Sequence, residues 1–152
     1  MKKKKKYNIA PTLRGHHLVC LHFFSGEGFE PEFQKNLNQI LSQVKKETIV
    51  IAQGADSICI RCEHIKNGKC EYQENQDEGI LKMDTKALQL LELKPGERIT
   101  WIEIKRKLSS IFKSWYESYC IQCDWQYVCK KNHLYDELSP IGTDFLKKHL
   151  PV

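Results

Sequence analysis

Seven cysteines in 152 residues are the feature of this sequence best suited to chemistry. Six of them form two triads, each a CxxC pair followed by a third cysteine: Cys59, Cys62 and Cys70, then Cys120, Cys123 and Cys129. A CxxC turn brings two thiolates to one ion or cluster while backbone N–H groups point at the sulfurs. The triads also resemble each other between the cysteines, because CIRCEH at 59–64 aligns with CIQCDW at 120–125. The spacing therefore predicts metal binding by a duplicated ligand loop.

The seventh cysteine, Cys20, lies in the segment RGHHLVC beside two histidines. On a helix, His16 and His17 are four and three residues from Cys20 and could share a face with it. This cluster could give one triad a fourth ligand, or place an acid–base pair next to a metal. The alternative to these two roles is that Cys20 is a buried cysteine beside surface histidines. His64, near the first triad, and His133, near the second, are further candidate ligands.

Two kinds of metal centre fit these cysteines. Structural zinc takes four ligands, so two zinc sites would each combine a triad with a histidine. A 4Fe–4S cluster also takes four ligands, and it tolerates three cysteines with another ligand or with one iron open to substrate. Neither triad has the CxxCxxC run of bacterial ferredoxins. Two complete sites need eight ligands, so seven cysteines require a histidine, an open iron or a shared centre.

Composition narrows the class of protein. With 41% apolar residues the chain can bury a core without disulfides. An odd number of cysteines, and a lysine-rich start with no apolar segment behind it, argue against secretion and predict the reducing cytosol. No run of 18 apolar residues predicts a membrane span. The net charge of +5 comes from Lys2–Lys6, which leaves residues 7–152 neutral, so no specific nucleic-acid binding is expected.

Periodicity predicts mainly helices. From Pro31, a good first helical residue, apolar residues recur at helical spacing until Lys45 and Lys46. Asp84 and Thr85 are predicted to cap a second helix that ends before Pro95 and Gly96. Residues 100–115 begin with a capping-box pattern, TWIE, and continue as an apolar stripe that is expected to pack in the core.

Short strands and loops complete the predicted fold. Residues 48–52 (TIVIA) are predicted to form a buried strand, residues 9–13 a short edge strand, and HHLVCLHFF one or two helical turns. Residues 54–79 show no sustained period, and a loop this long needs an organising element such as a metal. Asp56, three residues before Cys59, is expected to accept hydrogen bonds from the loop backbone.

The ordered motifs RGHHLVCLHFF, SGEGFEPEF, ADSICIRCEHIKNGKC and CIQCDWQYVC resemble an uncharacterised family of cysteine-rich prokaryotic proteins, catalogued as a domain of unknown function, whose members are commonly labelled iron–sulfur-binding proteins. The resemblance spans roughly residues 9–131. The family pattern matches at Arg14, Gly15, His16, His17, Cys20, Asp56, Cys59, Cys62, His64, Cys70, Cys120, Cys123, Trp125 and Cys129. It departs at Glu63 and Asp124, where proline is frequent, and no ligand is lost there. The resemblance implies an iron–sulfur cofactor and no particular reaction.

The sequence thus predicts a mainly helical α+β fold with a small sheet and two cysteine-rich metal-binding loops. Residues 1–7 are expected to be a disordered basic tail and residues 8–152 a single cysteine-rich domain that binds an iron–sulfur cluster, expected to be 4Fe–4S. The candidate ligands are Cys59, Cys62, Cys70, Cys120, Cys123, Cys129 and Cys20, with His16 and His64 as additional metal ligands. One centre or two are both compatible with this set.

Three classes of function remain open. An electron-transfer or storage protein would have every iron ligated and would meet a redox partner. A cluster enzyme would keep one iron open and use Arg14, His16 or His17 to hold an anionic or polar small-molecule substrate. A structural zinc module would have no redox behaviour. The sequence has no P-loop, dinucleotide-binding glycine pattern, GxSxG or HExxH motif, and it predicts neither a catalytic residue nor an oligomeric state.

Overall fold

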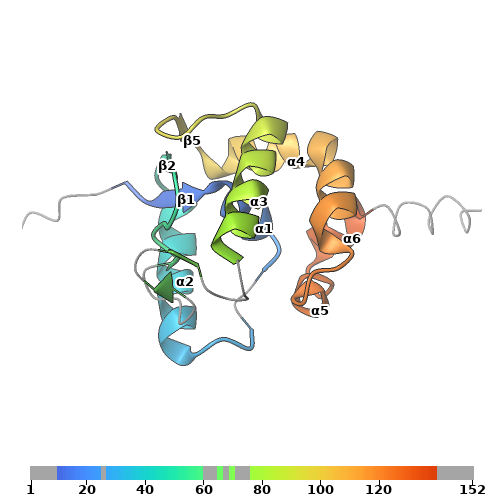
Figure 1. Cartoon of the computed structure of the whole chain (residues 1–152), viewed down its shortest axis with the longest axis horizontal. Helices are drawn as coiled ribbons and strands as arrows, with labels where there is room; N and C mark the ends of the chain where they lie inside the picture. The colour runs from blue at the N-terminus through green and yellow to red at the C-terminus, as the bar shows by residue number, and fades with distance from the viewer. Residues whose placement is uncertain (1–9, 25–26, 60–64, 67–68, 71–75, 140–152) are drawn as a thin grey trace, which may run out of the picture.

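Helices make up most of the described chain, and a small three-stranded sheet lies among them (Figure 1). The computed structural model describes residues 10–24, 27–59, 65–66, 69–70 and 76–139, with only the backbone at 65–66, 69–70 and 76–77. The elements are β1 (Thr12–Arg14), α1 (Gly15–Cys20), α2 (Pro31–Val44), β2 (Ile49–Ala52), β3 (Ile65–Lys66), β4 (Lys69–Cys70), α3 (Gln76–Leu91), β5 (Arg98–Ile99), α4 (Trp101–Trp115), the π-helix η2 (Tyr116–Cys120), α5 (Gln126–Cys129) and α6 (His133–Leu138). The mainly helical α+β prediction is confirmed.

The sheet has the order β1-β2-β5. β1 runs parallel to β2, with Leu13 beside Ile51, and β5 runs antiparallel to β2, with Ile99 beside Ile49. The predicted strand at 48–52 is therefore confirmed as β2. The strand predicted at 9–13 forms as the shorter edge strand β1, which begins three residues later and ends one residue later. It begins after Pro11, whose nitrogen has no hydrogen to donate to a neighbouring strand.

The two best-marked helices form where the sequence predicts them. α2 begins at Pro31, and Lys45 is its C-terminal capping residue. At the start of α4, the Glu103 N–H donates to Thr100 Oγ1 over 3.3 Å, and the Thr100 N–H donates to the Glu103 carboxylate over 2.9 Å. One face of α4 is then buried in the core. This face consists of Ile104, Leu108, Ile111, Phe112 and Trp115. Both boundaries follow from local chemistry that the sequence displays.

The third helix differs from its prediction. α3 begins at Gln76 instead of at Asp84 or Thr85, and Asp84 lies buried near its middle. The first half of α3 carries no apolar repeat, and Leu81 in this half is 41% exposed, so its sequence does not signal a helix. The predicted loop at 54–79 also contains the short β3–β4 hairpin, in which Ile65 pairs with Cys70.

α1 packs against α3 at very short range. A Cβ atom at Gly15 would lie 2.3 Å from the backbone oxygen of Asp84, so only glycine allows this approach. Leu18 and Val19 of α1 are fully buried. The fold therefore fixes α1 at the centre of the molecule, where its histidines and Cys20 can meet other elements.

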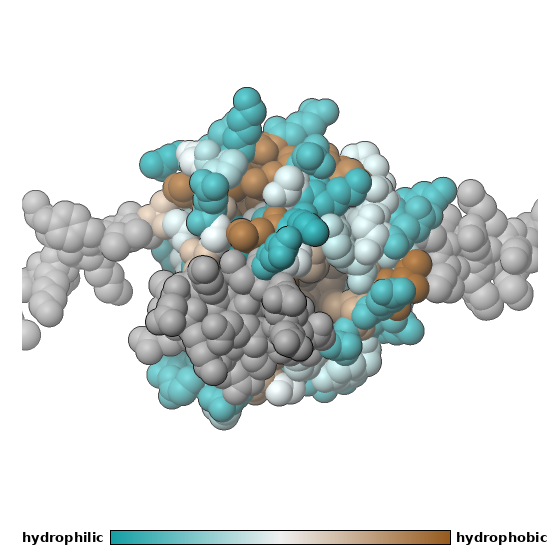
Figure 2. Space-filling view, viewed as in Figure 1, coloured by the Kyte–Doolittle hydropathy of each residue, from teal (hydrophilic) through white to brown (hydrophobic). Residues whose placement is uncertain are grey.

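The visible surface in Figure 2 is largely hydrophilic, with apolar side chains showing over the C-terminal half of α3 and the chain after it. An open depression of about 710 Å³ lies there, between the end of β2 and α3, and Leu88, Leu93 and Pro95 are among its lining residues. Its lining, as far as the structure describes it, includes no cysteine or histidine. Within the described ranges, none of the helices combines the length and apolar character that a bilayer crossing requires.

Candidate functional site

The seventh cysteine joins the second triad. Burial raises the pKa of the Cys20 thiol well above its ordinary value, and the charges of Cys120, Cys129 and Cys123 raise it further. An interaction of this kind requires the four sulfurs to be near one another. Cys20 comes from α1, whereas the other three come from the end of η2, the turn after it and the end of α5. We refer to Cys20, Cys120, Cys123 and Cys129 as the four-thiol group.

Local backbone geometry positions the three cysteines of the second triad. α4 passes into η2, where the Ile121 N–H reaches back to the Tyr116 carbonyl over 3.3 Å, and this wider turn ends at Cys120. Such π-helical turns often mark functional sites. The Cys123 N–H then donates to the Cys120 carbonyl over 3.1 Å, which closes the CxxC turn.

Polar donors surround the sulfurs of the four-thiol group. The backbone N–H groups of Trp125 and Gln126 donate to the Cys123 sulfur, as expected of a CxxC turn. The Trp115 side chain donates to Cys20, and Tyr135 donates to Cys120. These donors favour thiolates.

Burial opposes the charged form of the same thiols. It raises the pKa of Cys120 and of Cys129 to about 12, and neighbouring thiols add to the effect. Without a cation, both thiols therefore stay protonated at neutral pH. A bound metal reverses this balance, because its positive charge stabilises several thiolates at once.

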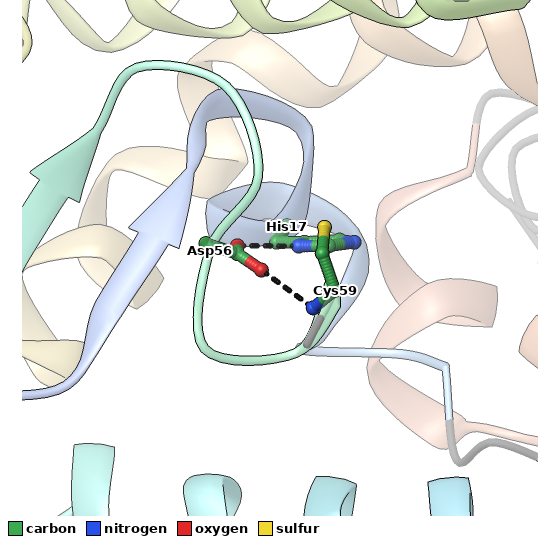
Figure 3. A group of neighbouring side chains, drawn as sticks. All are labelled: His17, Asp56 and Cys59. Carbon is green, nitrogen blue, oxygen red and sulfur yellow. Dashed lines mark hydrogen bonds and ion pairs between the residues drawn. The ribbon is translucent and has the colours of Figure 1, made fainter. Parts of the chain in front are cut away.

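The remaining described cysteine, Cys59, lies in a different cluster with His17 and Asp56 (Figure 3). One ligand atom from each of the three side chains lies within 4.8 Å of the other two. The Asp56 Oδ1 accepts from the N–H groups of Ile58 at 2.9 Å and Cys59 at 3.0 Å. Its Oδ2 accepts from the Arg14 N–H at 2.7 Å and from His17 Nδ1 at 2.6 Å. The expectation that Asp56 binds the loop backbone is confirmed.

Asp56 is ionised in this network. Burial alone would raise the pKa of its carboxyl group, but the charge and hydrogen bond of His17 and the N–H groups of Arg14 and Cys59 hold it far below its ordinary value. An ionised carboxylate only accepts hydrogen bonds, so His17 Nδ1 carries the proton that it shares with Asp56. This fixes the orientation of the imidazole ring.

A second buried carboxylate, Asp84, supports the same region from α3. Its Oδ2 accepts from Arg14 Nε at 2.8 Å, and its Oδ1 accepts from the backbone N–H of His16 at 3.0 Å and from His16 Nδ1 at 2.7 Å. Arg14, only 1% exposed, also donates from Nη1 to the Cys59 sulfur at 3.6 Å. The sequence does not predict this role of Asp84, because its partners are 68 and 70 residues away and no local pattern reports them.

These contacts define what Arg14 and His16 can do. Arg14 is buried and bound to Asp84 and Cys59, so it does not face solvent where a substrate would arrive. Burial lowers the pKa of His16 to about 4, with the charge of His17 contributing, so His16 is neutral at pH 7. Its Nδ1 is held by Asp84, and it is His17 that the structure brings to Cys59.

The other predicted ligands are placed only in part. Cys62 and His64 lie outside the described residues, and Cys70 is described only by its backbone in β4. His133 is 92% exposed and lies 3.4 Å from Glu137 one turn later on α6, so it points to solvent. Among the cysteines whose side chains are described, Cys59 is the one that lies with His17 and Asp56.

Comparison with known families matches residues 28–129 to the family described as "Protein of unknown function (DUF1284)". The matched stretch contains both triads and begins after α1, so His17 and Cys20 lie before it. No curated protein and no solved structure is significantly similar to the chain. Because the match covers more than half of the 152 residues, the chain belongs to this family.

Proposed function

We propose that the protein binds an iron–sulfur cluster of the 4Fe–4S type at the four-thiol group and uses it to carry electrons. The observation that supports this most directly is the meeting of Cys20 with Cys120, Cys123 and Cys129. Four thiolates are the ligand set that such a cluster takes. With Cys20 included, the second triad needs no histidine and leaves no iron open.

The spacing of the sulfurs favours a cluster over a single zinc ion. Tetrahedral zinc, with Zn–S bonds near 2.3 Å, holds its sulfurs about 3.8 Å apart. Among the described residues, the ligand atoms that lie within 4.8 Å of one another in a group of three belong to His17, Asp56 and Cys59. No three sulfurs of the four-thiol group lie that close together. A cluster binds each cysteine through a different iron and so spreads the sulfurs farther apart. The wider arrangement suits it better.

The surroundings fit a redox role. Hydrogen bonds to cluster sulfurs and partial burial both tune the reduction potential. Trp115, Tyr135 and backbone N–H groups supply such bonds here. Cys20, Cys120 and Cys129 are half-buried, whereas Cys123 is exposed. The exposed side gives a redox partner a short approach to the cluster, and complete cysteine ligation disfavours substrate binding to iron.

Anaerobic purification of the full chain tests the proposal. We expect a brown protein with about four iron and four sulfide per chain, whose visible absorption bleaches reversibly on reduction. Cys120→Ala should abolish the colour, whereas Cys59→Ala, at the cysteine outside the group, should retain it. A colourless protein that holds only zinc would overturn the proposed function.

A further inference from the structure

Tyr135 of α6 donates its hydroxyl hydrogen to the Cys120 sulfur. The oxygen of the same hydroxyl accepts a hydrogen bond from Gln126 Nε2 at 3.3 Å. A phenol is protonated at neutral pH and has a single hydrogen to donate. Because Gln126 is the donor in its contact with the phenol oxygen, the hydrogen of Tyr135 is left for the sulfur. The three side chains therefore form a short chain of hydrogen bonds that ends on one thiol of the four-thiol group.

Packing fixes the aromatic ring of Tyr135. The residue is 2% exposed, and its ring centroid lies 5.6 Å from those of Phe23 and Phe112, edge-on to both. The Tyr116 ring lies 6.2 Å away. Buried aromatic pairs in such arrangements add stability beyond the area that they bury. The ring therefore holds the hydroxyl in one position beside the sulfur.

Asn132 joins α6, and with it Tyr135, to the rest of the site. Its Oδ1 accepts from the Tyr135 N–H at 3.3 Å and so caps the start of α6. Its Nδ2 donates to the His22 carbonyl at 3.3 Å, on the segment that follows Cys20. Its own N–H donates to the Cys129 carbonyl at 2.9 Å. One asparagine thus connects the chain after two candidate ligands to the helix that carries Tyr135.

From these contacts we propose that Tyr135 raises the reduction potential of the cluster through its hydrogen bond to Cys120, and that Asn132 positions Tyr135 for this bond. The inference rests on the proposed function. In each cycle the cluster takes one electron from a redox partner and passes it on, while the O–H bond of Tyr135 stays intact. The reduced cluster carries one more negative charge, so a donor at a sulfur stabilises it more than the oxidised cluster.

Tyr135 differs from the backbone donors of the same group. The N–H groups of Trp125 and Gln126 reach the Cys123 sulfur as part of the CxxC turn, whose form recurs in other metal-binding loops. Tyr135 comes from α6, whereas the family match ends at residue 129. The bond from Tyr135 is therefore a contribution of α6 to a ligand loop of common form.

The test compares the reduction potentials of the anaerobically purified full-length protein and of Tyr135→Phe. Phenylalanine keeps the packed ring and removes the hydroxyl, so the fold and the cluster are expected to persist. We expect a lower potential, with an equilibrium constant for reduction that falls about tenfold, or roughly 59 mV for one electron. Tyr116→Phe is the matched control, because Tyr116 is 4% exposed and its loss of a hydroxyl leaves the Tyr135 bond intact. Its potential should equal that of the wild type.

Asn132→Ser tests the positioning role. Serine still caps a helix, but it is too short to keep the bond to the His22 carbonyl. We expect a fall in potential smaller than that of Tyr135→Phe. If Asn132 acts through Tyr135, the double variant should have the potential of Tyr135→Phe alone. An Asn132→Ser potential equal to that of the wild type, or fully additive effects, would overturn the positioning role.

An unchanged potential in Tyr135→Phe with full iron and sulfide would overturn the tuning role and leave the proposed function standing. Loss of iron from Tyr135→Phe would also overturn it, because Tyr135 would then hold the cluster in place instead of tuning it. A wild-type protein without iron and sulfide would remove the proposed function and the tuning role together. NMR of the metal-free wild type checks the contact itself: the Tyr135 hydroxyl proton should exchange slowly and show a nuclear Overhauser effect to Cys120, and its absence would contradict the hydrogen bond.

Discussion

The four-thiol group and the His17–Cys59 cluster are built from the same sequence motif yet have different surroundings. The first consists only of thiols, spread over α1, η2, the turn after η2 and α5, with neutral donors around the sulfurs and Cys123 exposed. The second joins an imidazole to a buried thiol and is enclosed by the charges of Arg14, Asp56 and Asp84. Duplicated CxxC loops therefore need not bind the same cofactor, because the residues that meet each loop differ.

The largest expected effect is at the four-thiol group. Cys20→Ala removes the ligand that only α1 can give to the second triad, so we expect loss of most iron and sulfide. Iron and sulfide analysis after anaerobic purification measures this loss. If Cys20→Ala keeps its full cluster, Cys20 is not a required ligand and the assignment of four thiols to one centre is wrong.

Removing Asp56 should affect the other site and the fold. Asp56→Ala leaves the buried N–H groups of Arg14, Ile58 and Cys59 and the Nδ1 of His17 without their acceptor. Losses of this kind cost about 3–5 kcal/mol of unfolding free energy. Urea denaturation of the metal-free protein measures the loss, and Glu117→Ala, at an exposed carboxylate, should change stability by less than about 0.5 kcal/mol. Equal stability of the two variants would contradict the structural role of Asp56.

The contact of α1 with α3 sets the geometry of both sites. A Cβ at Gly15 would meet the Asp84 backbone at 2.3 Å, so Gly15→Ala should destabilise the protein by about 1–3 kcal/mol. Gly79→Ala is the matched control, since no atom lies within 4 Å of its Cβ position on α3, and it should stabilise by about 0.5–1 kcal/mol. Thermal unfolding of both variants checks the opposite signs; a shift of the same sign in both would rule out close packing as the cause.

The smallest effect lies away from both sites. Thr100→Ala removes one side of the capping box at the start of α4 and should cost about 1 kcal/mol of stability. Iron and sulfide content should not change, because α4 carries no cysteine of the four-thiol group. Denaturant unfolding with metal analysis measures both quantities, and any loss of metal would show that the start of α4 is coupled to the sites.

Local signals explain which parts of the fold the sequence could predict. Pro31, the TWIE capping box and the β-branched run of β2 all act within a few residues, so they gave α2, α4 and β2. The grouping of the cysteines into three, three and one was also visible. The local pattern predicts Asp84 as a helix cap, whereas its contacts to Arg14 and His16 join segments that are distant in the sequence. Which triad receives Cys20 depends on how α1 packs, and periodicity does not report this.

The central claim is that the four-thiol group binds one 4Fe–4S cluster without Cys59. Iron and sulfide analysis of the anaerobically purified full chain, beside Cys59→Ala, tests it most directly. The account predicts about four iron and four sulfide per chain in both proteins. A protein that holds only zinc, or loss of the cluster in Cys59→Ala, would contradict it.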